Sequence, residues 1–248
     1  MTAPPTTGRL FAPVTKRIVL LANSSQQSGY QCLAGREVQW EGAALRSVGP
    51  WVRLVSPRGG SLRQSDVRLE DGSLPQLCDI VDVPLEYLHR NPLQPEDRVV
   101  AAEFPWHHPG RLSTAYLGML EQTPATLWHA RRRNPNQVSS LDVAKIEHLQ
   151  TLLLIRPKDP ELRIWSEPGS EPGAVEVRRR VRFHYHGTEY ELPIVDRRVL
   201  HENPKVPPVG AEPEVSIAPF GDESLFSINL AGPFGRMYHK VIVGVIRL

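Results

Sequence analysis

The chain has few cysteines, few aromatic residues and no long apolar run. With only Cys32 and Cys78 among 248 residues, it can build neither a disulfide framework nor a Cys-rich zinc site. No segment reaches the about eighteen apolar residues that a membrane span requires, and residues 1–14 lack the apolar centre of a secretory signal. We therefore expect a cytoplasmic chain with reduced thiols, no membrane contact and a short disordered leader at residues 1–14.

The signatures of common enzyme classes are missing as well. The sequence contains no G-x-S-x-G elbow, Walker A loop, G-x-G-x-x-G turn or H-E-x-x-H pair. The histidine pairs His107-His108 and His184/His186 have no further ligands at the spacing of a zinc site. These observations predict a protein that is not an enzyme and that binds no metal and no cofactor.

The overall charge is close to balance. A net charge of +2 is too small to identify a partner, because a local basic groove can be hidden within a balanced total. Any nucleic-acid site must therefore be sought in clusters of arginine rather than in the composition.

Proline and glycine are plentiful, and they separate short apolar segments. The 24 prolines and 18 glycines favour short strands joined by turns over long helices. In the first half, β-branched or apolar segments bounded by turn residues predict strands at residues 17–22, 38–40, 51–55, 79–83 and 98–102. Five short strands in fewer than about a hundred residues suit a small barrel.

The middle of the chain has helical signals, and strands resume after it. Thr123-Pro124 and Asn134-Pro135 predict a helix over residues 124–133, and Ser139-Ser140 predicts another over 141–148. Further strands are expected at residues 152–155, 162–165, 175–185, 189–195, 225–230 and 240–246. A proline-rich excursion over residues 196–223 is too long for a hairpin loop. The predicted division is a leader at 1–14, a barrel at 15–109, a helical connector at 110–148 and a second barrel at 149–248.

A row of arginines supplies the main functional signal. Arg178, Arg180 and Arg182 alternate with apolar residues on one predicted strand, so they share a face and suit a phosphate backbone. Arg53 and Arg58 add charge to the first barrel, and Trp51 is a candidate platform for base stacking. The alternative is that the arginines of the row pair with Glu189 and Glu191 across the hairpin, and that the aromatic side chains belong to the core.

Several motifs of the first half resemble one known family. They are Ala22-Asn23-Ser24, Cys32-Leu33-Ala34-Gly35 and Pro50-Trp51-Val52-Arg53-Leu54-Val55-Ser56, followed by Asp71-Gly72-Ser73, by residues 77–81 and by Gln94-Pro95-Glu96. In this order they resemble the bacterial dual OB-containing domain family, and the second half fits the family more loosely. The resemblance implies an all-β chain of two OB-like barrels in tandem, joined by the short helical connector. It also implies oligonucleotide binding in an accessory protein of a bacterial DNA-processing or defence system.

The leading interpretation is a non-catalytic protein that binds single-stranded or locally opened DNA or RNA. The residues expected to contact the nucleic acid are Arg53, Arg58, Arg178, Arg180, Arg182, Trp51, Asn23 and Ser24. A second interpretation is a scaffold subunit that meets a protein partner through residues 196–223. A third is an enzyme or sensor of a small nucleotide, which would need a pocket with convergent polar groups around Asn23, Ser24 and Cys32.

Overall fold

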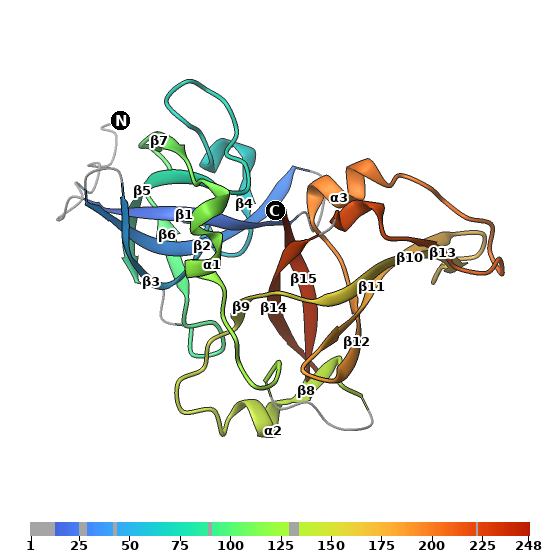
Figure 1. Ribbon diagram of the computed structural model, residues 1–248. Coiled ribbons are helices and arrows are strands. Elements are labelled where there is room, and N and C mark those ends of the chain that lie inside the picture. Colours follow the sequence, from blue (N-terminus) through green and yellow to red (C-terminus); the bar gives the residue numbers. More distant parts are fainter. Residues whose placement is uncertain (1–12, 25–28, 42–43, 89–90, 129–133, 222) are drawn as a thin grey trace, which may run out of the picture.

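The computed structural model describes residues 13–24, 29–41, 44–88, 91–128, 134–221 and 223–248 (Figure 1). Strands dominate it, and the chain forms two OB-like barrels side by side, with β8 (Gln137–Ser139) and α2 (Ser140–Val143) of the connector at the bottom of this view. The predicted fold class is therefore confirmed. Most of the predicted leader lies outside the described residues. In the described part of the chain, no helix is long and apolar enough to cross a membrane.

The first half closes into a five-stranded barrel. Its strands are β1 (Val14–Ser24), β2 (Tyr30–Glu41), β3 (Ala44–Val55), β5 (Asp79–Leu88) and β6 (Asp97–Val100), with β4 (Leu62–Arg63), the 3-10 turn η1 (Gln64–Asp66) and β7 (His107–Arg111) beside them. They pair in the order β1-β2-β3-β6-β5, and β5 pairs back to β1. Only the β3–β6 pairing around the barrel is parallel. This closed Greek-key arrangement is that of an OB fold.

Glycine and a bulge shape the first barrel where its strands are most crowded. A Cβ atom on Gly35 would lie 2.0 Å from the carbonyl oxygen of Val19, so the Cys32–Gly35 motif owes its glycine to close backbone packing. The whole motif lies within β2. Between Leu20 and Ala22 the β1–β2 register shifts by one residue, which leaves Leu21 as a bulge.

The connector is less helical than its sequence suggests. It holds η2 (Thr114–Tyr116), α1 (Leu117–Leu120), β8 (Gln137–Ser139) and α2 (Ser140–Val143). The predicted helix at 124–133 is wrong over its described part, where residues 125–128 form bends. Here Leu127 and Trp128 are buried in the second core, and the indole N–H of Trp128 donates to the Gln150 carbonyl at 2.7 Å. Tertiary burial of these side chains overrides the local helix signal.

The second half repeats the same connectivity with a broken first strand. Its elements are β9 (Leu152–Ile155), β10 (Lys158–Pro168), β11 (Val175–Tyr185), β12 (Thr188–Pro193), β14 (Ser224–Phe234) and β15 (Met237–Arg247). β9 pairs with β14, whereas β10 pairs with β11, so the two segments share the role of one long strand. A parallel bridge between Ile194 and Ile242 joins the end of β12 to β15. Two four-stranded sheets thus enclose one core in a partly open barrel.

The proline-rich excursion begins with a short helix. It contains α3 (Arg197–Glu202), β13 (Glu214–Ser216) and η3 (Ala218–Phe220), and β13 adds an edge strand to β10. Arg179 interrupts the apolar pattern of β11 because its guanidinium donates to the carbonyls of Asn203 and Lys205. The excursion is therefore tied to the second barrel.

A shared core joins the two barrels. It combines residues from both halves, namely Val19, Leu21, Ala34, Val38, Trp51, Leu152, Leu154, Leu225, Val243 and Ile246 with others. The bulge at Leu21 turns its carbonyl to the second barrel, where the Ser227 hydroxyl donates to it at 2.6 Å. The two barrels are thus packed against each other through a shared core and are not joined by the connector alone.

Glu96 provides a polar link across this junction, and its loss should be costly. The buried carboxylate accepts hydrogen bonds from both the backbone N–H and the hydroxyl of Thr151, which is itself fully buried. Glu96→Ala would leave these donors unpaired, and we expect it to lower the free energy of unfolding by about 2–4 kcal/mol. Denaturant unfolding measures this. A loss below about 0.5 kcal/mol would show that the link does not form in solution.

Candidate nucleic-acid interface

The arginine row lies where the sequence predicts it, on the outer face of β11. Register places Arg178 opposite Trp165, Arg180 opposite Arg163 and Arg182 opposite Glu161. The row is interleaved with carboxylates. Arg178 bonds to Glu167 at 2.8 Å and to Glu176 at 2.7 Å, and Arg182 bonds to Glu161 at 2.6 Å.

Arg178 and Arg182 therefore pair with carboxylates, but the expected partners Glu189 and Glu191 are wrong. Glu191 pairs with Arg163 at 2.7 Å rather than with the row, and Arg180 donates to the Glu191 backbone carbonyl. The hydrogen bond that Arg178 donates to Glu167 raises the pKa of Arg178, and the hydrogen bond that Arg182 donates to Glu161 raises the pKa of Arg182. Within this face, the carboxylates offset the positive charge that would attract a phosphate backbone.

The two arginines predicted on the first barrel are also paired. Arg53 is largely buried and donates from Nε to Asp97 Oδ1 at 2.6 Å. Arg58 is exposed, and its guanidinium lies 3.5 Å from the buried carboxylate of Asp66. Neither side chain is an uncompensated charge.

Trp51 belongs to the core. Its side chain is 2% exposed, and its indole N–H donates to the side-chain carbonyl of Gln122 at 2.8 Å. The ring therefore holds the connector against β3 and presents no open face for a base to stack on. This is the core alternative that the sequence left open.

A cleft of about 740 Å³ lies between the barrels and is lined by residues of both barrels and of the connector. One wall comes from Arg36, Pro50 and Trp51, and a second from the β5–β6 loop and the start of β6. The lining is completed by the connector residues that follow α2 and by the turn end of the β14–β15 hairpin. The remaining lining residues are Pro92, Leu93, Pro95, Glu96, Arg98, Ser140, Val143, Ala144, residues 146–150, Pro233 and Tyr238. OB folds bind oligonucleotides with their second and third barrel strands and with the loop between the fourth and fifth. In this chain these parts are β2, β3 and the β5–β6 loop, and they form two walls of the cleft.

The cleft holds two guanidinium groups that lack a carboxylate partner among the described residues. Arg36 donates from Nε to the Gly49 carbonyl at 2.7 Å, and Arg98 donates to the Pro95 and Asp97 carbonyls at 2.9 and 2.7 Å. Burial lowers the pKa of Arg36, although a guanidinium stays charged at neutral pH. The carboxylates of the lining are the exposed Glu147 and the buried Glu96, which is bound to Thr151. The cleft can therefore accept an anion.

Sequence reasoning missed both of these arginines because neither stands in a basic run. Arg36 is a single charge within β2, and Arg98 follows Asp97, which suggests a local ion pair. Only barrel topology brings them to one cleft. The alternation of β2 could have placed Arg36 on the outward face, but not beside the β5–β6 loop.

The Asn23–Ser24 pair lies at a different point of the junction. Ser24 is buried and forms an antiparallel bridge with Asp196. Asn23 lines a smaller cavity with Gln31 and residues of α3. Cys32 lies in β2 with its Sγ 3.2 Å from the Ser61 hydroxyl, outside the lining of that cavity.

Titratable side chains elsewhere have structural partners. The carboxylate of Asp82 bonds to Arg17 at 2.7 Å, which lowers its pKa, and lies 3.2 Å from the His107 ring. Over the described residues, no group of three or more His, Cys, Asp or Glu side chains has a geometry that could hold a metal ion.

Comparison with known proteins agrees with this architecture. A search of curated proteins finds no match to the chain. The family described as "Dual OB-containing domain" matches residues 16–245, which is nearly the whole length and includes both barrels. The chain therefore belongs to the dual OB-containing domain family.

Proposed function

We propose that this protein binds single-stranded or locally opened nucleic acid, without catalysis, in the cleft between its barrels. OB folds generally bind nucleic acids or proteins, and this cleft uses two of the parts that OB folds use for oligonucleotides. In line with the family resemblance, we further propose an accessory role in a bacterial DNA-processing or defence system.

One observation carries the proposal, namely the contrast between the cleft and the other arginine clusters. Among the residues that the structure describes, Arg36 and Arg98 have backbone carbonyls as their only partners, whereas Arg53, Arg178 and Arg182 are bound to carboxylates. A guanidinium presents five N–H donors in a planar fork that matches phosphate. Prolines and Leu93 on the walls offer apolar contact to sugars and bases, in place of aromatic stacking.

Fluorescence anisotropy with labelled dT20, rU20 and a duplex of equal length tests the proposal across a salt series. We expect single strands to bind more tightly than the duplex, with an affinity that falls steeply as salt rises. Arg36→Ala should weaken binding by about tenfold and reduce the salt slope by about 0.7, the value for one lost phosphate contact. Arg46→Ala is the matched control, because Arg46 lies on the same hairpin but pairs with Glu41. No binding at low salt, or equal losses in both variants, would refute the proposal.

A second candidate function rests on the excursion. Val206, Val209, Val215 and Ile217 are exposed there, beside the edge strand β13. An exposed apolar patch next to a free strand edge is typical of a protein-binding surface. The scaffold interpretation predicts that Val206→Asp with Ile217→Asp removes a protein partner and leaves oligonucleotide affinity unchanged.

A further inference from the structure

A smaller cavity lies on another side of the barrel junction. It measures about 300 Å³ and is lined by the ends of β1 and β2, residues 74–77, Arg111 of β7 and the first part of α3. It shares no lining residue with the cleft described above. In Figure 1, α3 lies at the top of the second barrel and α2 at the bottom of the molecule. The two sites can therefore act independently.

Its lining holds buried amide groups that lack a hydrogen-bond partner within the part of the chain that the structure describes. Gln31 is 4% exposed, and its Oε1 accepts a hydrogen bond from Arg197 at 3.0 Å. This bond fixes the orientation of the amide and leaves the Nε2 donor buried without a partner. Asn23 Oδ1 is a buried acceptor that is also unpartnered. Because buried polar groups are nearly always satisfied, this donor and acceptor point to a missing ligand.

The rim of the cavity is cationic. Arg111, Arg197, Arg198 and His201 line it, and Asp196 is its only carboxylate among the lining residues. That carboxylate is occupied, because it accepts the backbone N–H groups of Val199 and Val245, both at 2.9 Å. Arg111 pairs with Asp79 at 3.0 Å, and Arg198 lies 3.9 Å from Glu202. Within the described residues, Arg197 has no carboxylate partner, so the rim favours an anion.

We propose that this cavity binds a phosphomonoester group, carried either by a free nucleoside monophosphate or by the 5′ end of a nucleic-acid strand. Arg197 and Arg198 bind the phosphate oxygens, and Gln31 Nε2 donates to an oxygen acceptor. Asn23 Oδ1 accepts from a hydroxyl or N–H group of the same ligand. The volume is at the lower end of the range for small-molecule sites, which matches a ligand of mononucleotide size.

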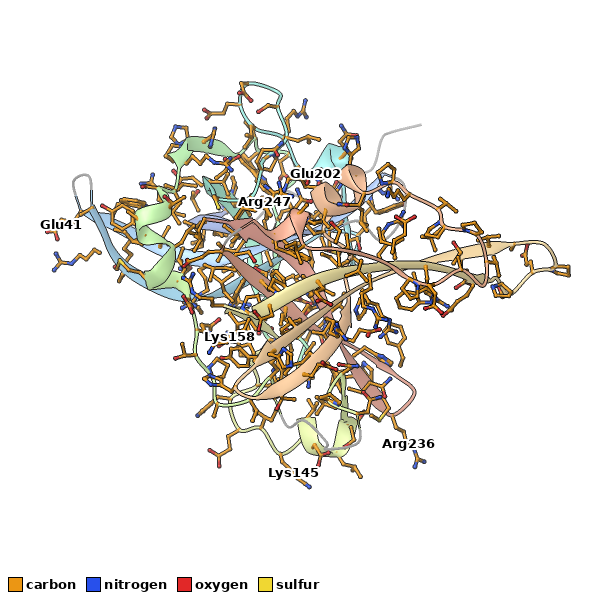
Figure 2. The ribbon with its side chains drawn as sticks, turned by 45° about the vertical axis from the view of Figure 1, so that its right-hand side comes forward. Glu41, Lys145, Lys158, Glu202, Arg236 and Arg247 are labelled. Atoms are coloured by element: carbon orange, nitrogen blue, oxygen red, sulfur yellow. The ribbon has the colours of Figure 1, made fainter. Side chains whose placement is uncertain are left out.

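Isothermal titration calorimetry on the full chain tests the site with adenosine 5′-monophosphate, adenosine and inorganic phosphate. We expect the monophosphate to bind at least tenfold more tightly than adenosine. Gln31→Leu and Arg197→Ala should each weaken it at least tenfold. Arg236→Ala should not, because Arg236 is exposed at the β14–β15 turn away from α3 (Figure 2).

Two outcomes overturn the proposal: no phosphate-dependent binding, or equal binding by wild type and Arg197→Ala. Arg197 is exposed, so its variant remains informative if Gln31→Leu fails to fold. Comparing dT5 with and without a 5′ phosphate identifies the source. A strand end is indicated if the phosphorylated oligonucleotide binds at least tenfold more tightly than the monophosphate. A free nucleotide is indicated if the monophosphate binds at least as tightly as the phosphorylated oligonucleotide. Because the sites share no residue, failure here leaves the cleft proposal standing, and the reverse also holds.

Discussion

Gly244→Ala should destabilise the protein by about 3 kcal/mol, although it adds a single methyl group. A Cβ atom at position 244 would lie 2.3 Å from the Leu21 carbonyl oxygen and 3.1 Å from the Ala22 Cα atom. Both atoms belong to the backbone of the other barrel and cannot rotate away. The same carbonyl accepts the Ser227 hydroxyl, so any shift also breaks a buried hydrogen bond. For a chain of this size, the loss corresponds to a fall in melting temperature of about 6–12 °C.

Gly118→Ala is the matched control for this prediction. Nothing lies within 4 Å of a Cβ atom at Gly118, which is in the short helix α1. Alanine is a better helix former than glycine, so the control should be neutral or slightly stabilising. If Gly244→Ala melts with the control and the wild type, the barrels do not pack against each other as the structure shows.

Lys240→Met should stabilise the protein at neutral and lower pH. Lys240 is fully buried, its ammonium donates to the Pro135 carbonyl, and it lies 5.1 Å from the centre of the Tyr190 ring. No carboxylate partner appears among the described residues. Burial lowers the pKa of Lys240 from 10.5 to about 7. Methionine keeps the apolar stem without the charge.

The lowered pKa of Lys240 makes the stability of the wild type depend on pH. Between about pH 7 and 10.5 the folded protein holds a neutral amine while the unfolded chain binds a proton, so stability rises with pH. Below about pH 7 both states are charged, and the full cost of burial remains. We expect the methionine variant to gain between about 2 and 5 kcal/mol of stability there, because each unit by which burial lowers the pKa of Lys240 corresponds to about 1.4 kcal/mol.

Thermal unfolding of both proteins from pH 6 to 9.5 measures the effect. The difference in stability between variant and wild type should shrink as pH rises. Lys145→Met is the control, because Lys145 is exposed and its replacement should alter stability little at any pH (Figure 2). A constant difference across the range would show that Lys240 keeps an ordinary pKa.

Much of the fold could be predicted from the sequence, because strand signals are local. The strands at 152–155 and 175–185 match β9 and β11 residue for residue, since the first is a continuous apolar run and the second alternates apolar with polar residues. The short predictions at 38–40 and 51–55 cover only the ends of β2 and β3. Polar residues and glycine within these strands face outward or pack closely, and no local pattern distinguishes them from a loop.

The candidate sites could be predicted only in part, because they depend on pairing across the chain. Alternation placed Arg178, Arg180 and Arg182 on one face, but the carboxylates that neutralise this row come from β10 and from β11 itself. The sequence indicates Asn23 as a candidate contact residue, and Asn23 lines a cavity in the structure. Its neighbours Gln31 and Arg197 come together only when α3 of the second barrel meets the first.

The central claim is that nucleic acid binds in the cleft rather than on the arginine row. Two double variants with the same change in net charge test it directly, Arg36→Glu/Arg98→Glu in the cleft and Arg178→Glu/Arg182→Glu on the row. The measurement is the affinity for dT20 across a salt series. We predict that the affinity of the cleft variant falls at least about thirtyfold and that its salt slope falls by about 1.4, the value for two phosphate contacts. The affinity of the row variant should change by less than about threefold. A large loss in the row variant with an unchanged cleft variant would contradict the account.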